Sequence, residues 1–436
     1  MRQRKGFTLV EMMVAMALTL FIMVILSQAF VAALETFRQL KAIGDMEERL
    51  RSVSTLLRRE LAADHFEGRK RLSNPGFFNG GPPREGFFRI FQGSATAVAG
   101  PANFWEGYDS DGIGSTRATD HLLHFTVKLR GNNPQDVFTA SIGSASLLNG
   151  YQPPIDSRYQ SSGNYNSQWA EVAYFLRANG DTTSGAPGVG TPLFSLYRRQ
   201  RLLVPLNSGV TDSTDTTGTY PVNVYANVSC SEPLVASPGP PPYYPVYFNS
   251  PNDITIPERR FAMSNNAGTT QPPPPPITIA NGRYPILADN ASITTPGADL
   301  LLTDVISFDI RFMIPQSATP RALPSPPYPA GSYLDSFIDL YDSEALYQGM
   351  AALGVLTSNN SALPPPPVPP ATVGVPKVFD TWSSVNDGVY NYTTWAAPGS
   401  PQSLPLPLTI QAIKITLRIW DKKTQRTRQV SFIQDM

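Results

Sequence analysis

Few residues in this 436-residue sequence have a type and spacing that could do chemistry. His121 and His124 could form a metal-binding pair. Alternation along a strand puts residues three apart on opposite faces, so we expect both to be ordinary strand residues. Asp109 and Asp111, with Asp120 further on, flank a glycine-rich turn and resemble the start of a calcium-binding loop, although the later ligands of that pattern are missing. Calcium at these aspartates is the cofactor to consider, and a plain turn is the alternative.

Motifs of the common enzyme classes are missing. The sequence has no GxxxxGK[ST] phosphate loop, no HExxH zinc motif and no GxSxG nucleophile elbow. A single cysteine, Cys230, excludes an intrachain disulfide and cysteine-based zinc or redox sites. The 34 Lys+Arg balance the 34 Asp+Glu, so the chain as a whole has no electrostatic attraction to nucleic acid. We therefore expect neither an enzyme nor a general nucleic-acid-binding protein.

An apolar segment near the N-terminus contains one acid. In residues 7–26 only Thr8, Glu11 and Thr19 are polar, and as a helix this segment would reach about 30 Å, the thickness of one bilayer core. The apolar regions of signal peptides are shorter and end at a small-residue cleavage site, whereas this one continues into an amphipathic pattern. We therefore predict a transmembrane segment.

Glu11 is the residue on which the interpretation depends. An ionised glutamate in a membrane segment costs on the order of 2.5–3.5 kcal/mol, and less near the interface, so it needs a partner or must reach the headgroups. The positive-inside rule predicts a cytoplasmic N-terminus, because three basic residues precede the segment: Arg2, Arg4 and Lys5.

The sequence RKGFTLVEMMVAMAL resembles the N-terminal signature of type IV prepilins and pseudopilins, in which a short basic leader ends in glycine and a glutamate follows. The resemblance implies that a prepilin peptidase cleaves between Gly6 and Phe7, removes the leader (residues 1–6) and methylates the Phe7 amine. In a filament, Glu11 of one subunit would then pair with the Phe7 ammonium of a neighbour. An ion pair of this kind would neutralise both charges inside an apolar bundle.

A long helix should follow without interruption. Apolar residues recur every three or four positions from Phe30 to Leu61, the period of a helix, and the first proline is Pro75. We predict one helix over residues 7–67, roughly 90 Å long, with Gly68 as its stop. Acid–base pairs four residues apart lie on its opposite face: Asp45 with Arg49, and Glu47 with Arg51.

The remaining chain, residues 75–436, reads as a β-rich body. Apolar and polar residues alternate in several of its segments, which predicts half-buried strands, and strands that follow a single helix indicate an α+β fold. We expect an antiparallel sheet packed on the C-terminal half of the helix. The predicted strands are 123–129, 172–176, 193–204 and 306–314, followed by a hairpin of 414–420 with 428–433.

Proline-rich insertions interrupt the body at about residues 205–300 and 315–405. They include the proline runs 272–276 and 364–367, which favour extended polyproline II backbone. We expect stiff surface connections, and the alternative is a ligand for aromatic-lined grooves on partner proteins. The tyrosines beside Pro240–Pro242 make that alternative worth testing: Tyr243, Tyr244 and Tyr247.

A second resemblance is weaker. The order of LLRRELAAD, RATDHLLHFTV, WAEVAYFLRA, DVISFDIRFMI and QAIKITLRIW is similar to the larger minor pseudopilins, the J type of type II secretion, and to W-type minor pilins. It implies a single-pass inner-membrane protein with a periplasmic body that later joins a periplasmic or extracellular filament. The implied partners are other pilins, the prepilin peptidase, the inner-membrane assembly platform and, before assembly, lipid.

Two functions fit this reading. The first is a structural subunit that primes or joins a type II secretion pseudopilus or a type IV pilus. The alternative is a filament-tip adhesin or ligand-binding module, including one for DNA uptake, on the same anchor. Charged hairpin turns are usually solvated, so we do not expect the basic C-terminal hairpin, or a patch extended by Arg198, Arg199 and Arg201, to bind nucleic acid. Its basic residues are Lys414, Arg418, Lys422, Lys423, Arg426 and Arg428.

Overall fold

The structure is a computed structural model, and it describes a large part of the chain. The described residues are 8–77, 83–92, 103–108, 114–119, 121–131, 133–141, 164–185, 189–205, 211–212, 227–231, 246–255, 259–260, 298–315, 321–322, 333–334, 337, 377–381 and 409–436.

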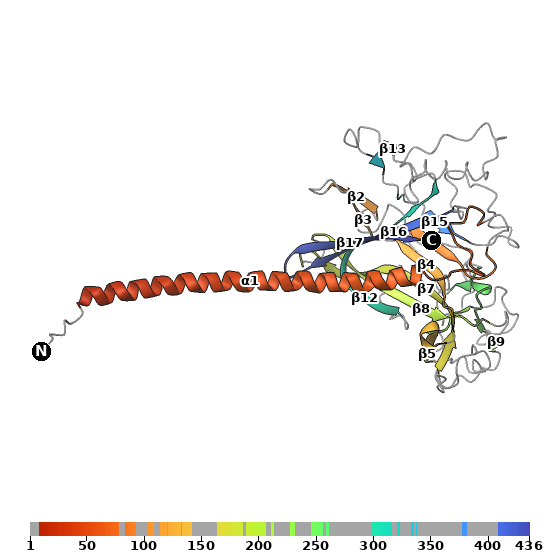
Figure 1. Cartoon of the computed structure of the whole chain (residues 1–436), viewed down its shortest axis with the longest axis horizontal. Helices are drawn as coiled ribbons and strands as arrows, with labels where there is room; N and C mark the ends of the chain where they lie inside the picture. Colours follow the sequence, from red (N-terminus) through yellow and green to blue (C-terminus); the bar gives the residue numbers. More distant parts are fainter. Residues whose placement is uncertain are drawn as a thin grey trace.

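The α-helix α1 (Leu9–Leu61) projects far beyond the body (Figure 1). Thr8 caps its N-terminus, and the Ala62 N–H bonds back to the Arg58 carbonyl at its C-terminus. The helix ends before Gly68, because the chain then turns to bridge a strand: the Lys128 N–H donates to the Asp64 carbonyl at 2.7 Å. Residues 8–38 are exposed, and the helix residues that are buried against the body begin at Met46 and continue, one or two per turn, to Leu61.

In the part of the chain that the structure describes, seventeen strands form one large sheet and four small ones. The eight-stranded sheet has the order β15-β1-β4-β7-β8-β12-β16-β17, and every neighbouring pair is antiparallel. Its strands are β1 (Phe88–Gln92), β4 (Leu122–Lys128), β7 (Trp169–Thr182), β8 (Pro192–Leu202), β12 (Ala298–Met313), β15 (Lys377–Asp380), β16 (Ala412–Asp421) and β17 (Arg426–Asp435).

The small sheets and the two 3-10 turns of the described residues lie outside the main sheet. The small sheets comprise β2 (Asn103–Tyr108) with β3 (Gly114–Ala118), β5 (Phe138–Ser141) with β6 (Asn164–Ser167), β13 (Arg321–Ala322) with β14 (Tyr333–Leu334), and β9 (Thr211–Asp212) with β10 (Cys230–Ser231) and β11 (Val246–Phe248). The turns are Pro134–Asp136 and Asp253–Thr255.

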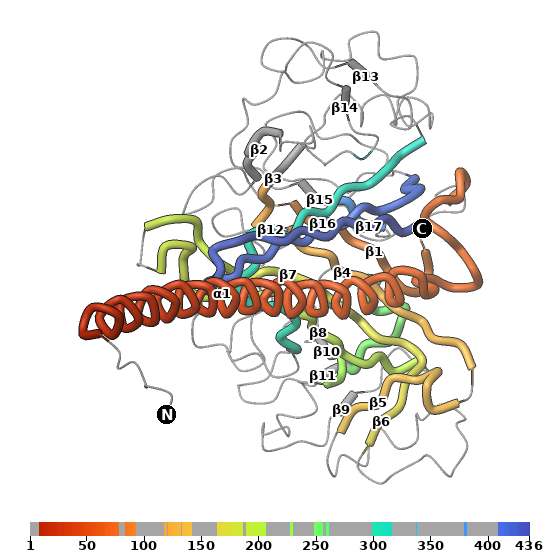
Figure 2. The backbone as a smooth tube through the Cα atoms, turned by 60° about the vertical axis from the view of Figure 1, so that its left-hand side comes forward, coloured from red at the N-terminus to blue at the C-terminus, as the bar shows by residue number. Residues whose placement is uncertain are grey.

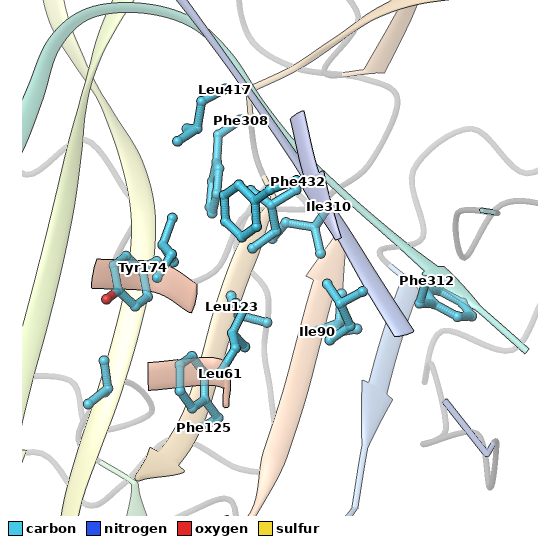
Figure 3. Close-up of a cluster of buried hydrophobic side chains, with 14 of the residues drawn as sticks. Leu61, Ile90, Leu123, Phe125, Tyr174, Phe308, Ile310, Phe312, Leu417 and Phe432 are labelled. Carbon is cyan, nitrogen blue, oxygen red and sulfur yellow. The ribbon is translucent and has the colours of Figure 1, made fainter. Parts of the chain in front are cut away.

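The core lies between α1 and one face of the large sheet. Helix residues Leu50, Leu57 and Leu61 pack on alternate residues of the strands, including Phe125 of β4 and Phe308 of β12 (Figure 3). The other residues of each strand point to the opposite face, called the back face below. The prediction of an α+β fold with a sheet on the C-terminal half of the helix is confirmed. The helix acids and bases also contact the sheet: Glu47 pairs with Arg428 at 3.2 Å.

The structure differs from the sequence prediction in two places. Strands β1 and β15 were not expected, because all five residues of β1 are buried and β15 is four residues long inside a proline-rich region. His121 lies just before β4, not within it, and its Nδ1 accepts the Ile310 N–H at 3.0 Å. The Gln92 side chain donates to the Ile310 carbonyl at 2.8 Å. The His121 and Gln92 side chains therefore satisfy the backbone N–H and C=O groups of Ile310, in the part of β12 that extends past β8.

Candidate functional site

Glu11 lies in the first turn of α1 and forms a capping box with Thr8. Its carboxylate accepts the Thr8 N–H at 2.8 Å and the Thr8 hydroxyl at 2.9 Å, and the Glu11 N–H donates to the same hydroxyl at 3.3 Å. A serine or threonine cap with a glutamate three residues on satisfies helix N–H groups that have no partner in the first turn. The single subunit therefore provides hydrogen bonds to Glu11 but no counter-charge from the described residues.

The other predicted site residues lie outside the described part of the chain. These are the processing residues Gly6 and Phe7, the leader residues Arg2, Arg4 and Lys5, and the calcium candidates Asp109, Asp111 and Asp120. Among the residues that the structure describes, no group of three or more His, Cys, Asp or Glu side chains could hold a metal ion. Cleavage, methylation and calcium binding therefore stay predictions.

The surface around Glu11 is apolar for most of the length of the free helix. Every large apolar side chain between Leu9 and Leu40 is exposed. Within the described residues, α1 is the one helix long and apolar enough to cross a membrane. Exposed apolar surface on this scale requires lipid or other apolar helices around it.

The C-terminal end of α1 is fixed to the sheet by a buried ion pair. Glu60, 2% exposed, accepts hydrogen bonds from the Tyr174 hydroxyl and from the Arg198 guanidinium, whose Nε lies 3.0 Å from Glu60 Oε1. Burial lowers the pKa of Arg198, but its hydrogen bonds to Glu60 and the charge of Glu60 outweigh this effect, so the pKa is raised. Burial raises the pKa of Tyr174 well above its ordinary value, and Glu60 adds to the effect. Arg198 therefore stays charged and Tyr174 stays neutral over the physiological pH range.

Sequence analysis missed this ion pair. Glu60 follows Leu57 by three residues, on the apolar face of the helix, where an acid needs a buried partner. That position could have identified Glu60 as a buried acid from the sequence. No local pattern indicates its partner, because Arg198 lies 138 residues away in the sequence.

Just beyond the helix, His65 joins the chain to β4. Its ring nitrogens lie 2.6 Å from the Thr126 carbonyl and 3.1 Å from the Leu61 carbonyl, and burial lowers its pKa. Gly86 packs on the His65 backbone with φ +77°, and a Cβ there would lie 2.0 Å from the His65 carbonyl oxygen. Only glycine fits this backbone conformation and this close approach.

Part of the first proline-rich insertion packs on the back face. Arg260 is fully buried, donates to the Ile254 carbonyl at 2.7 Å and to Asp380 of β15 at 2.7 Å, and lies 3.7 Å from the Phe87 ring centre. Arg89 Nε lies 3.6 Å from the same Asp380 carboxylate. Residues of both insertions thus meet in one buried charge cluster, and Ser229, Ile254 and Arg260 of the first insertion are buried in the body.

A second back-face cluster contains His124, Glu171 and Ser229. His124 Nε2 lies 3.0 Å from Glu171 Oε1, and the Ser229 hydroxyl donates to the other oxygen of Glu171. Burial lowers the pKa of His124. Nucleophilic catalysis needs the base next to the hydroxyl, whereas here the carboxylate lies between them. The arrangement anchors the segment around Ser229 to β7 rather than activating the serine.

The basic C-terminal hairpin does not form one patch. By strand alternation, Lys414 and Arg418 point to the back face, whereas Arg426 and Arg428 lie on the side of α1. Lys422 pairs with Asp181 at 2.7 Å and Asp304 at 2.9 Å. The other basic candidates are split in the same way: Arg198 faces the helix, and Arg199 and Arg201 point to the back.

The comparisons with known proteins agree with the N-terminal reading. A family model, the prokaryotic N-terminal methylation motif, matches residues 1–27. No curated protein and no solved structure matches the chain significantly. Helix α1 starts inside this motif and is long and apolar enough to cross a membrane, and an antiparallel sheet packs on its C-terminal part. Together these features define an anchored α+β protein with a processing signal. The signal is that of type IV prepilins and pseudopilins, and the fold is consistent with the pilin-like class.

Proposed function

We propose that this protein is a minor pilin-like subunit of a type II secretion pseudopilus or a type IV pilus. The observation that carries the proposal is the methylation motif at residues 1–27, continued by an exposed apolar helix with one acid near its start. In this proposal, a prepilin peptidase cleaves between Gly6 and Phe7 and methylates the new amine. The N-terminus is cytoplasmic and the body periplasmic before the subunit enters a filament.

The capping box gives Glu11 a defined state before assembly. In the lone subunit, Thr8 supplies both hydrogen bonds to the carboxylate, which lowers but does not remove the cost of an unpaired charge in lipid. In the filament, the Phe7 ammonium of a neighbouring subunit supplies the missing counter-charge. Opposite charges attract more strongly in an apolar bundle than in water, so this pairing sets the axial position of adjacent helices.

The body supports a structural role for the described parts of the first insertion. Arg260 and Ser229 come from this region, and each contacts a buried acid of the large sheet, Asp380 and Glu171 respectively. A separate adhesive module would need few contacts with its carrier. We therefore propose that the insertion stabilises the subunit and that the Glu60–Arg198 ion pair couples the helix rigidly to the body.

The test is replacement of Glu11 by alanine in a host that makes the filament. We expect Glu11→Ala to enter the membrane normally and to lose incorporation into filaments by roughly tenfold or more, since the neighbour's ammonium is left unpaired. Glu35→Ala is the matched control. Glu35 lies on the same helix, is 58% exposed at its side chain and pairs weakly with Arg38 at 3.8 Å.

Incorporation is measured by immunoblotting of sheared filaments or of the cross-linked pseudopilus, and membrane insertion by carbonate extraction. Normal incorporation of Glu11→Ala, equal to that of Glu35→Ala, would contradict the proposed pairing.

A further inference from the structure

The last strand of the large sheet leaves one long edge open. β17 (Arg426–Asp435) pairs with β16 over its whole length, with an unbroken register from Ala412 opposite Asp435 to Asp421 opposite Arg426. Among the described residues, no strand pairs with its other side. The opposite edge of the sheet is different, because β15 has four residues and its Asp380 is buried under Arg260. The two edges therefore differ in their capacity to accept another strand.

The backbone groups available at this edge follow from the pairing pattern. The Met436 N–H donates to the Gln411 carbonyl at 2.9 Å, so residues of even number in β17 point their backbone groups at β16. By the same alternation, the backbone N–H and C=O groups of Ile310 in β12 point away from β16. The hydrogen bonds of these two groups to the His121 and Gln92 side chains agree with this pattern. The N–H and C=O groups of Thr427, Gln429, Ser431, Ile433 and Asp435 therefore point outward. The Asp435 carbonyl already accepts the Gln434 side-chain amide at 3.1 Å.

Half of this edge lacks the usual protection against pairing. Natural edge strands are kept unpaired by short length, bulges, prolines, charges or a cover. Residues 429–434 have no charge, no proline and no bulge, and seven of the ten strand residues are exposed. Ile433 is 49% exposed. β17 runs beside α1, so the edge lies along the helix that other subunits would approach (Figure 2).

A second copy of this chain does not fit the edge. Antiparallel pairing of two β17 strands would reverse one α1 relative to the other, which two anchors in one membrane do not permit. Parallel pairing of the two outer edges turns the second sheet over and puts the two α1 helices on opposite faces of the joined sheet, so the helices cannot enter one bundle. This argument uses the membrane anchor of the proposed function.

We propose that β17 accepts an extended segment of a different polypeptide as an added antiparallel strand. The charges of the edge specify that segment: an acidic residue near its C-terminal end, opposite Arg426, and an apolar residue beside Ile433. Arg428 already pairs with Glu47 of α1 at 3.2 Å, so Arg426 carries most of the charge preference. Main-chain hydrogen bonds supply affinity in this mode, and side chains supply selectivity. Thr427, Gln429 and Ser431 on the back side of the strand accommodate polar neighbours.

A defined probe tests this proposal on the full chain in lipid nanodiscs. The probe is a fluorescent peptide of about ten residues that alternates threonine and valine and has two glutamates near its C-terminus. Two peptides serve as comparisons, one with lysines replacing the glutamates and one with alternate backbone amides methylated. We expect the acidic peptide to bind roughly tenfold more tightly than the lysine peptide. The methylated peptide should not bind, and hydrogen exchange should slow at Gln429, Ser431 and Ile433.

Two variants locate the binding on β17. Gln429→Pro removes an outward N–H without breaking a hydrogen bond to β16, a change that edge strands tolerate. It should weaken binding of the acidic peptide by roughly tenfold or more. Gln429→Ala keeps the N–H and is the matched control, with unchanged affinity expected. Arg426→Glu leaves the backbone intact. It should weaken binding of the acidic peptide and strengthen binding of the lysine peptide, each by about two- to fivefold.

Equal binding of the acidic peptide to Gln429→Pro and Gln429→Ala would overturn the proposal, as would no measurable binding to the unaltered chain. If Gln429→Pro does not fold, Arg426→Glu decides, and an unchanged charge preference then rejects the site. These readouts are independent of leader cleavage and of Glu11, so failure here is distinguishable from failure of the proposed function.

Discussion

Replacing Arg198 by methionine should weaken the attachment of α1 to the body severely. The variant leaves the Glu60 carboxylate buried at 2% exposure with the Tyr174 hydroxyl as its remaining donor. Removing one partner of a buried ion pair typically costs about 3–5 kcal/mol, because the other charge stays in a low-dielectric site. Asp299, 3.2 Å from Arg198 Nη1, has a side chain that is 64% exposed and regains water, so it adds little to that loss.

The converse change should cost less. Glu60→Gln keeps an acceptor for Tyr174, and Arg198 keeps Asp299 as a partner, so we expect a loss of about 1–3 kcal/mol. The double variant should lose less than the sum of the two single variants, by about 1 kcal/mol or more, because the two residues interact directly.

Urea unfolding of the full chain in detergent, followed by tryptophan fluorescence, measures these losses from the midpoint at constant m-value. Arg38→Met is the control: Arg38 lies on the same helix and pairs with Glu35 at the surface, so we expect a change within about 0.5 kcal/mol. A loss below about 1 kcal/mol for Arg198→Met, or strict additivity in the double variant, would refute the reasoning.

Two further perturbations test the body. Burial holds the pKa of His121 at about 4, so the folded chain stays neutral there while the unfolded chain takes up a proton below about pH 6.5. The contribution of His121 to stability should be complete above that pH and fall by about 1 kcal/mol per unit toward pH 5, and the lowered pKa values of His65 and His124 add to this loss. Urea midpoints at pH 7.5 and 5.0 check this, with a smaller slope expected in His121→Asn, and a midpoint that rises on acidification contradicts it. Gly86→Ala should cost more than about 2 kcal/mol because its Cβ meets the His65 carbonyl, whereas Gly44→Ala, in an open helix position, should stabilise the chain by about 0.5–1 kcal/mol. The melting temperatures of the two variants measure these effects, and similar melting temperatures would contradict the close packing of Gly86 on His65.

Helix and strand periodicity predicted most of the large sheet. The strands β4, β7, β8, β12 and β16, and the return of β17, lie where alternation placed them, since each has one face on the helix and the other toward the back. The long helix followed from its three-to-four residue period and the late first proline. These features are local, and a single sequence contains the information that specifies them.

The rest depends on contacts between distant segments. β1 is buried on both faces and does not alternate, so periodicity cannot identify it. Arg260 reads as a surface residue next to a proline-rich stretch, yet it binds Asp380, 120 residues further on. Glu11 is the exception among the site residues, because an acid in an apolar run identifies it in the sequence. Its cap, Thr8, was missed, although a threonine three residues before a glutamate is the spacing of a capping box.

The central claim is tested most directly by the mass of the mature N-terminus. The account predicts that the protein isolated from membranes of a host with the prepilin peptidase begins at Phe7 and has one methyl group on its amine. Peptide mapping by mass spectrometry should find no peptide that contains residues 1–6, and a peptidase-deficient host should retain them. A mature membrane fraction that still begins at Met1 in the host with the peptidase would contradict the account.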